Sequence, residues 1–362
     1  VRILFRETPG HTPESISIIV FDKQKSSDTP YAVLTGDTLF IGDVGRPDLM
    51  ASVGWTSEQL AGKMYDSLHQ KLMILPDETL VYPAHGAGSL CGKNLSKETV
   101  STIGTQRITN YAVQPMTKEE FIAMLTAEQP DAPNYFGYDA ALNTQERRIL
   151  EDILDQTVMP LSIRTVLDLQ KEGAQILDTR DPLYYAAAHL AGSINIGLNG
   201  QYATWAGTVL DHSRPVVIIA DTDEERAAIM RLGRIGFDNI AGYLESGMSA
   251  GIPEQLIEQT THIDVEELAK ELAASNIPVI DVRGPGEWRA KRIEGSVNIP
   301  LNHLQERMRE LPKGSSFVLH CQTGYRSSIA ASILQHAGIN NFKELVGGLA
   351  ACRPERFSIV VS

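Results

Sequence analysis

The residues with the clearest chemical potential lie in Leu319–Ser328, which reads LHCQTGYRSS. An apolar run ends at Cys321, a short loop with Gly324 and Arg326 follows, and a helix-like segment begins at Ser327. Backbone N–H groups in such a loop converge on one point, and the helix N-terminus adds partial positive charge, so the site favours an anion. A thiol there loses its proton easily. The pattern predicts a nucleophilic cysteine, rather than an inert buried one, that tolerates a negatively charged adduct on its sulfur.

This segment resembles the active-site loop of rhodaneses, the sulfurtransferases that carry sulfane sulfur as a cysteine persulfide. Their six-residue loop from cysteine to arginine is matched by Cys321 to Arg326, and their flanking motifs by Val279–Arg283 and Ile293–Pro300. Two positions depart from the family pattern without touching the nucleophile: Arg292 stands where His is usual, and Cys352 lies where Trp is usual. The resemblance implies catalytic roles for Cys321, Arg326 and Gly324. It implies substrate contacts for Gln322, Thr323 and Tyr325.

An internal repeat precedes this segment. Ile176–Arg180 matches Val279–Arg283, and Gly192–Ile196 matches Gly295–Ile299, both at the offset of 103 residues that separates Asp178 from Asp281. The sequence therefore contains two copies of one domain. We expect Asp221 to take the position of Cys321 in the first copy. A carboxylate cannot hold a persulfide, and acids in the loop repel an anionic donor, so the first copy is predicted to be catalytically silent and to serve packing or docking.

The N-terminal part contains residue types that bind metals. His11, Asp37 and His85 each stand beside a glycine where an apolar strand begins or ends. Two imidazoles and a carboxylate from separate strand ends form a plausible metal face. One such histidine alone is usually an ordinary loop residue, but three fragments of this kind in one segment favour a metal site.

Together these fragments resemble the C-terminal half of a metallo-β-lactamase-fold domain. The His-x-His-x-Asp-His motif of that fold is absent from this sequence, and the chain begins at Val1 inside a strand-like run. We therefore expect a missing N-terminal portion that carries the motif. The resemblance implies that His11, Asp37 and His85 are the metal residues of this part.

The loop after Asp37 distinguishes between chemistries. The segment Gly36–Leu49 resembles the persulfide dioxygenase branch, in which Gly-Arg is followed shortly by Asp, whereas glyoxalase II enzymes have aromatic residues there. That branch binds one Fe(II) per chain through two His and one Asp, which leaves open positions for sulfur and oxygen. The resemblance implies iron ligands at His11 and Asp37, with His85 on the second-metal side. Arg46 and Asp48 are expected to brace the site, although an ordinary surface salt bridge is the alternative.

The segment His85–Lys93 resembles bacterial proteins that fuse such a dioxygenase to rhodanese domains. Lys93 is expected to hold the carboxylates of a thiol substrate. Cys91 is expected to accept sulfur near the iron, and a small buried thiol is the equal alternative.

The elements that position these residues follow from periodicity. Residues 1 to about 40 are typical of antiparallel strands, Ser57–Lys71 and Lys118–Thr126 of helices, and Thr79–Tyr82 of a strand. From about Leu161 short apolar strands alternate with helices, which indicates parallel α/β units. The predicted fold class is α/β and α+β multidomain: the C-terminal part of a metallo-β-lactamase αββα sandwich and linker (1–155), a silent rhodanese-like domain (156–258) and an active rhodanese domain (259–362).

Composition narrows the partners. The 362 residues carry a net charge of −13, which argues against nucleic acid and anionic membranes. Three scattered cysteines indicate a reducing compartment, and no apolar run reaches transmembrane length, so we expect a cytoplasmic protein and a homo-oligomer. The predicted activity is iron-dependent oxidation of a small thiol persulfide by oxygen to sulfite, coupled to sulfur transfer that yields thiosulfate. The alternatives are a thioester hydrolase with two Zn per chain, or a sulfur carrier only.

Overall fold

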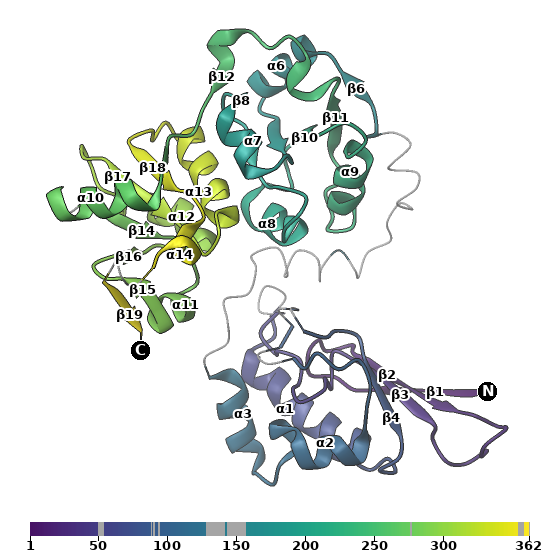
Figure 1. The fold of residues 1–362 in the computed structure, drawn as a ribbon. Coiled ribbons are helices and arrows are strands. Elements are labelled where there is room, and N and C mark those ends of the chain that lie inside the picture. Colours follow the sequence, from purple (N-terminus) through teal and green to yellow (C-terminus); the bar gives the residue numbers. More distant parts are fainter. Residues whose placement is uncertain are drawn as a thin grey trace. The chain divides into compact units, whose positions relative to one another are not determined.

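The computed structural model describes residues 1–49, 54–87, 89, 91–92, 95–127, 142, 157–275, 277–353 and 358–361. The chain divides into two compact units, Val1–Gln145 and Glu146–Ser362 (Figure 1). Within the described residues, no helix is both long and apolar enough to span a membrane.

The first unit is built on a mixed five-stranded sheet in the spatial order β1-β2-β3-β4-β5. Strands β1 to β3 are antiparallel neighbours, β3 and β4 are parallel, and β5 closes the sheet in antiparallel fashion. The strands are β1 (Arg2–Glu7), β2 (Ile16–Phe21), β3 (Ala32–Gly36), β4 (Leu80–Pro83) and β5 (Ser101–Thr102). In β2, Ser17, Ile19 and Phe21 are buried while the residues between them are not, the alternation expected of a strand with one covered face.

Helices cover one face of this sheet. They are α1 (Ser57–Ser67), which continues as the π-helical η2 (Leu68–Leu72), α2 (Ile103–Thr109), the 3₁₀ turn η3 (Tyr111–Val113) and α3 (Lys118–Thr126). Capping boxes at Thr56 and Thr117 start α1 and α3, because each threonine satisfies backbone N–H groups of the first turn. Met64 and Phe121 from these helices pack with Ile19 in the core. The predicted helices are confirmed.

The opposite face of the sheet carries an apolar row. Phe5, Ile18, Leu34 and Tyr82 are register partners across four strands. Phe5 is 64% exposed, and Leu34 and Tyr82 are each 42% exposed. A sheet with apolar residues on both faces is typical of one layer of a sandwich.

The second unit contains two copies of one α/β fold. Each has a parallel five-stranded sheet, in the orders β6-β11-β10-β7-β9 and β13-β18-β17-β14-β16. The first copy comprises β6 (Pro160–Leu161), α6 (Ile163–Lys171), β7 (Gln175–Asp178), α7 (Pro182–Ala187), β8 (His189–Leu190), β9 (Ile194–Asn195), α8 (Tyr202–Val209), β10 (Val216–Ile219), α9 (Glu225–Gly233), β11 (Ile240–Leu244), η4 (Gly247–Ser249), η5 (Glu254–Leu256) and β12 (Ile257–Glu258). The second comprises β13 (His262–Ile263), α10 (Val265–Ser275), β14 (Val279–Asp281), α11 (Pro285–Ala290), β15 (Lys291–Ile293), β16 (Val297–Asn298), η6 (Leu301–His303), α12 (Leu304–Arg307), η7 (Met308–Glu310), β17 (Phe317–His320), α13 (Tyr325–His336), β18 (Phe342–Leu345), α14 (Gly348–Ala351) and β19 (Ile359–Val361).

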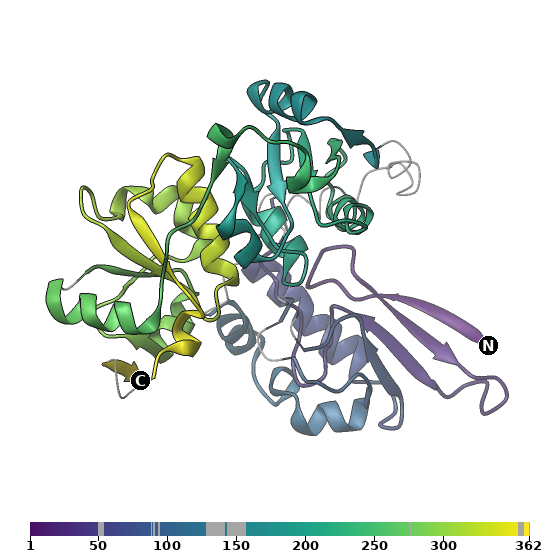
Figure 2. The same cartoon turned by 45° about the horizontal axis from the view of Figure 1, so that its top comes forward.

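The two copies share one hydrophobic core through α13. This helix packs against β9 of the first copy, and Ile194 and Ile329 belong to the same buried cluster. Figures 1 and 2 show α13 on the side of its domain that is turned toward the first copy. Polar contacts add to the packing, because Asn195 accepts a hydrogen bond from Ser328 Oγ at 2.7 Å and its backbone N–H donates to Ser332 Oγ at 3.0 Å. The first copy therefore supports the helix that begins at the cysteine loop.

Candidate functional site

Cys321 lies at the C-terminal end of β17, in the loop that leads into α13. The side chain is buried, with 1% exposure. The backbone N–H of Gly324 donates to Cys321 Sγ at 3.2 Å, and Gly324 has a φ of 119°, which favours glycine. On the other side, Gly348 approaches so closely that a Cβ there would lie 2.6 Å from the Cys321 carbonyl oxygen. The loop is therefore fixed on both sides with an N–H aimed at the sulfur.

Arg326 extends to the mouth of this loop and pairs with Glu287. Its two terminal nitrogens donate to the Glu287 carboxylate at 2.6 and 2.8 Å. Burial raises the pKa of Glu287, but the bonds to Arg326 outweigh it and hold that pKa below its usual range. The guanidinium is thus an oriented charge that is already balanced by a carboxylate.

The other loop residues point in different directions. Gln322 accepts a hydrogen bond from Arg283 at 3.3 Å, and its side chain and that of Thr323 are exposed. The Tyr325 hydroxyl donates to the carbonyl oxygen of Gly197 in the first copy at 2.8 Å. Tyr325, predicted to contact substrate, therefore packs on the neighbouring copy.

Buried Asp–Arg pairs hold the equivalent strand ends in both copies. Asp281 and Arg283 form two short side-chain bonds, and Asp178 and Arg180 repeat them at the same 2.6 and 3.0 Å. The amide of Asn298 bridges the carbonyl oxygens of Asp281 and Arg283, and Asn195 does the same in the first copy. The repeat seen in the sequence is thus a repeat of buried polar contacts.

The expectation that Asp221 takes the position of Cys321 is wrong by one residue. Asp281 is the register partner of His320, and Asp178 is the partner of Ile219, so the residue equivalent to Cys321 is Ala220. The loop between the strand and the following helix is one residue longer in the first copy. An alignment that starts from the helix and allows no gap therefore pairs Cys321 with the wrong residue. The first copy still has no thiol at the strand end.

A cavity of about 400 Å³ lies beside this loop of the first copy. It is lined by Thr179, Asp181, Leu183, Tyr184, Asn199, Asp221 and Glu224. Its three carboxylates give the loop a negative character, which opposes anionic sulfur donors. The prediction that this copy is silent rests on these residues and on the missing thiol.

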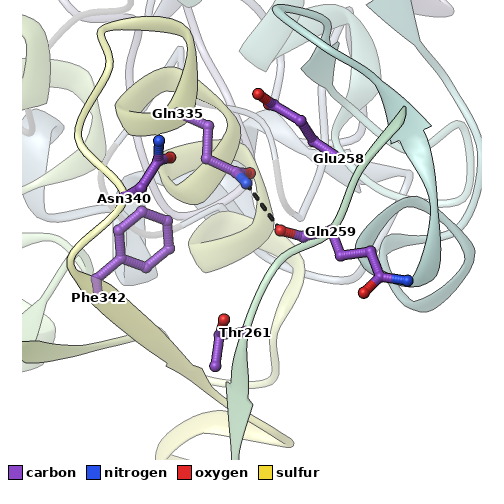
Figure 3. Close-up of a pocket in the computed structure, with 6 residues that line it drawn as sticks. All are labelled: Glu258, Gln259, Thr261, Gln335, Asn340 and Phe342. Carbon is purple, nitrogen blue, oxygen red and sulfur yellow. Dashed lines mark hydrogen bonds between the residues drawn. The ribbon is translucent and has the colours of Figure 1, made fainter. Parts of the chain in front are cut away.

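A second cavity, of about 220 Å³, lies at the far end of α13 from Cys321. Figure 3 shows its lining, in which Gln335 donates a hydrogen bond to the backbone oxygen of Gln259. The lining residues are Glu258, Gln259, Thr261, Gln335, Asn340 and Phe342. They include no thiol or imidazole, so this cavity is separate from the nucleophile.

In the first unit, the predicted metal residues come together at one edge of the sheet. Asp37 follows β3 and His85 follows the parallel strand β4, so both reach the same edge. Asp37 Oδ1 is 2.8 Å from His85 Nδ1, and Asp37 Oδ2 is 3.3 Å from His11 Nε2. Burial raises the pKa of Asp37, but the bond to His85 and the charges of both histidines together outweigh burial and lower that pKa. The bond to Asp37 raises the pKa of His85 to about 10.

Arg46 braces this cluster from its outer side. Its carbonyl oxygen lies 2.8 Å from His11 Nδ1, which leaves Nε2 directed at Asp37. The buried guanidinium forms a bidentate pair with Asp48, at 2.6 and 2.7 Å. Gly45 has no room for a side chain, because a Cβ there would lie 2.0 Å from the Asp37 carbonyl oxygen.

Cys91, which was expected to accept sulfur near the iron, joins this cluster as a third possible donor. One donor atom each from His11, Asp37 and Cys91 lie within 4.8 Å of one another, the spacing of a possible metal site. Burial raises the pKa of Cys91, but hydrogen bonds to His11, His85 and Ser89 outweigh it and lower the pKa to about 6. Lys93, predicted to bind substrate, lies outside the described residues.

Comparison with known proteins gives the relationship of the second unit. The rhodanese-like domain model matches residues 162–252 and 264–353, which together make up half of the chain. The chain belongs to the rhodanese-like domain family. A sulfurtransferase of Allochromatium vinosum is 32% identical over 90 residues, which are 25% of this chain and 84% of that protein. The predicted pair of rhodanese-like domains is confirmed, while their limits, predicted at 156–258 and 259–362, stay predictions.

Other relatives are of another kind, and the first of these matches is longer than the first unit alone. A metallo-β-lactamase structure from Staphylococcus aureus is 32% identical and superimposes with a TM-score of 0.55, over 67% of this chain and 66% of that one. Mouse mitochondrial persulfide dioxygenase ETHE1 is 32% identical over 120 residues, 33% of this chain. The chain spans 38% of the length of that relative. A metallo-β-lactamase-type part joined to two rhodanese-like domains, the predicted fold class, is confirmed.

Proposed function

We propose that this protein couples metal-dependent oxidation of small thiol persulfides to sulfite with sulfane-sulfur transfer at Cys321. One observation carries the proposal: a single chain contains both a sulfur-binding cysteine loop and a possible metal cluster. In the loop, the Gly324 N–H donates to the sulfur of Cys321, and in the cluster His11 lies beside Asp37. The identity of 32% over 120 residues with a persulfide dioxygenase supports the oxidative half.

The residues of the first unit fit a metal ion. An imidazole nitrogen, a carboxylate oxygen and a thiol sulfur lie within 4.8 Å of one another. One Fe(II) held by His11 and Asp37 would supply open coordination positions at which sulfur and oxygen meet. The protein contributes the orientation: the Arg46 carbonyl fixes the His11 ring, and His85 holds the second oxygen of Asp37.

Sulfur transfer at Cys321 is a pair of displacements. The thiolate attacks the outer sulfur of a persulfide, a new S–S bond forms, the old S–S bond breaks, and the small thiolate leaves. Sulfite then attacks the outer sulfur on Cys321, which forms thiosulfate and returns the thiolate. The Gly324 N–H, at 3.2 Å from Sγ, stabilises the negative charge in both steps.

The test is oxygen uptake by iron-loaded protein on addition of glutathione persulfide. We expect uptake that needs iron, and we expect C321S to keep the uptake but lose thiosulfate formation. Treatment with an iron chelator should stop the uptake and leave sulfur transfer from thiosulfate intact. Absence of iron-dependent uptake in protein of verified iron content would overturn the oxidative half.

A second candidate is a zinc-dependent thioester hydrolase with an attached sulfurtransferase. The Cys91 thiol in the donor cluster favours this hydrolase, because a soft thiolate ligand prefers zinc to harder cations. A probable metallo-hydrolase of Bacillus subtilis is 42% identical over 79 residues, which are 22% of this chain. Two zinc ions per chain together with hydrolysis of S-lactoylglutathione would support this candidate. The homo-oligomer and the cytoplasmic location stay predictions.

A further inference from the structure

A line of hydrogen-bonding groups runs from Cys321 to the surface of its domain. Cys321 Sγ lies 3.5 Å from Ser327 Oγ, and Ser327 Oγ lies 2.6 Å from Glu344 Oε1. The other oxygen of Glu344 is 3.5 Å from His262 Nε2. Glu344 is only 4% exposed, whereas the His262 side chain is 29% exposed. A buried carboxylate is thus connected to the nucleophile on one side and to the surface on the other.

Three elements of the second copy bring these groups together. Ser327 lies in the first turn of α13, directly above the strand end that carries Cys321. Glu344 and His262 are register partners on the parallel strands β18 and β13, which places their side chains on the same face. The arrangement therefore follows from the strand order and needs no special loop.

We propose that Ser327, Glu344 and His262 form a proton relay that deprotonates Cys321. This rests on the proposed role of Cys321 as the sulfur-transfer nucleophile. The single hydroxyl proton of Ser327 has three acceptors within reach: Glu344 Oε1 at 2.6 Å, the Gly324 carbonyl oxygen at 3.1 Å and Cys321 Sγ at 3.5 Å. When the proton lies on the shortest of these bonds, to Glu344, the serine oxygen can accept a proton from the thiol.

The proton balance of the relay is simple. The S–H bond of Cys321 breaks and its electron pair stays on sulfur, while the proton passes to Ser327 Oγ. The hydroxyl proton of Ser327 passes to Oε1 of Glu344, and a half-turn of the protonated carboxyl group carries it to His262, which faces the other oxygen and releases a proton to solvent. The serine hydroxyl, which now points at the sulfur, donates to the thiolate and stabilises it. Ser327 contacts the reacting sulfur, whereas Glu344 and His262 are positioning residues that act through it.

The silent copy provides an internal comparison. Its residue equivalent to Ser327 is Ala227, because Ser328 and Ala228 make the same first backbone bond of their helices. Tyr243 takes the place of Glu344, since each pairs with the matching residue of the central strand. Pro160 takes the place of His262. The copy without the cysteine has therefore lost every member of the relay, while it keeps the Asp–Arg and Asn contacts that only support the fold.

Other charged groups around the nucleophile do not replace the relay. They are Arg326 paired with Glu287, and Asp281 paired with Arg283 beside His320. Burial outweighs the nearby Asp281 and lowers the pKa of His320, whose Nδ1 donates to the Cys321 carbonyl. Among these side chains, Ser327 is the one that forms a hydrogen bond with the sulfur, at 3.5 Å.

The test measures thiolate formation as a function of pH. Alkylation of Cys321 by iodoacetamide, followed by the mass of its peptide, gives the rate without any sulfur substrate. We expect S327A and E344Q to move the half-maximal rate of alkylation to higher pH, and to slow sulfur transfer from thiosulfate to cyanide by about a hundredfold at neutral pH. Both rates should approach the wild-type values at alkaline pH, where the thiol ionises without help.

Control variants separate the relay from structural damage. S328A removes a neighbouring buried serine of the same helix that bonds Asn195, and its alkylation profile should match the wild type. E344D keeps a carboxylate and should restore most of the rate lost in E344Q. Wild-type pH profiles in folded S327A and E344Q would overturn the relay, as would equal profiles of E344D and E344Q when both are folded. If E344Q misfolds, a wild-type profile in folded S327A overturns the relay by itself. Absence of sulfur transfer in the wild type would instead refute the proposed function, because alkylation still reports on the relay.

Discussion

Gly200 of the silent copy lies directly under the ring of Tyr325, and this contact gives a sharp prediction. A Cβ on Gly200 would lie 2.2 Å from Cζ and 2.3 Å from Cε2 of Tyr325. Carbon atoms in contact normally lie about 3.5–4.0 Å apart, so G200A overlaps the ring by more than about 1 Å. The ring cannot simply move away, because its hydroxyl donates to Gly197 and its backbone begins α13.

The expected loss follows from these contacts. Displacing the ring removes one hydrogen bond, which contributes about 1 kcal/mol. Forcing a methyl group into a filled site costs about 1–2 kcal/mol more. We therefore expect G200A to lower the free energy of unfolding of the second unit by about 2–3 kcal/mol. Because Tyr325 follows Gly324 in the cysteine loop, the rate of sulfur transfer should fall as well.

Urea unfolding followed by tryptophan fluorescence measures the effect, since Trp205 and Trp288 report on the two copies. G286A is the matched control, because a Cβ on Gly286 has no atom within 4 Å. In a Y325A background the clash is absent, so G200A should cost less than about 0.5 kcal/mol there. Equal costs of G200A with and without the Tyr325 ring would refute the reasoning.

Three further predictions concern other sites. Burial lowers the pKa of His189 from 6.5 to about 4, and Glu258, 3.9 Å away and half-exposed, does not offset this effect. As the pH falls, the imidazole therefore binds its proton in the unfolded chain before it does so in the folded chain. Up to about 3 kcal/mol of folding stability is lost as the pH falls from 6.5 to about 4. Unfolding of H189Q should lack that dependence, and an unchanged one contradicts the assignment. N195A should cost about 1 kcal/mol more than N298A in urea unfolding, because only Asn195 also bonds α13; equal costs exclude this. G45A should lower the bound iron per chain about tenfold or more, measured by elemental analysis, because it displaces a metal residue while leaving Cys321 untouched; full iron content would refute it.

Local patterns predicted much of the fold. The helix at Lys118–Thr126 was predictable because Thr117 provides a cap, and the repeat was predictable because Asp178 and Asp281 sit in matching motifs. His11 and Asp37 were predictable as a pair because each ends or begins a strand.

Contacts between residues far apart in the chain, and the register of strands and loops, could not be predicted from the sequence. Cys91 reaches His11 across eighty residues, so only the family resemblance, and no local pattern, pointed to its place near the metal residues. Glu344 and His262 meet only because β18 and β13 are neighbours in space. The match of Asp221 to Cys321 was wrong because the loop of the first copy has one added residue. The helix after the loop can still be aligned, but the strand before it is then shifted by one residue. The hydrogen bond from Tyr325 to Gly197 could not be foreseen either, because Gly197 belongs to the other copy; the substrate contact of Tyr325 stays a prediction.

The extra loop residue in the silent copy also matters to anyone who wishes to build a second reaction centre into this scaffold. Replacing Asp221 by cysteine would place the thiol one residue past the position equivalent to Cys321. Replacing Ala220 alone would leave a lengthened loop with no glycine at its last position, Glu224. A working design has to shorten the loop before any side chain is exchanged. By this geometry, loop length matters more than the identity of one residue to whether a thiol in the first copy can take the place that Cys321 has in the second.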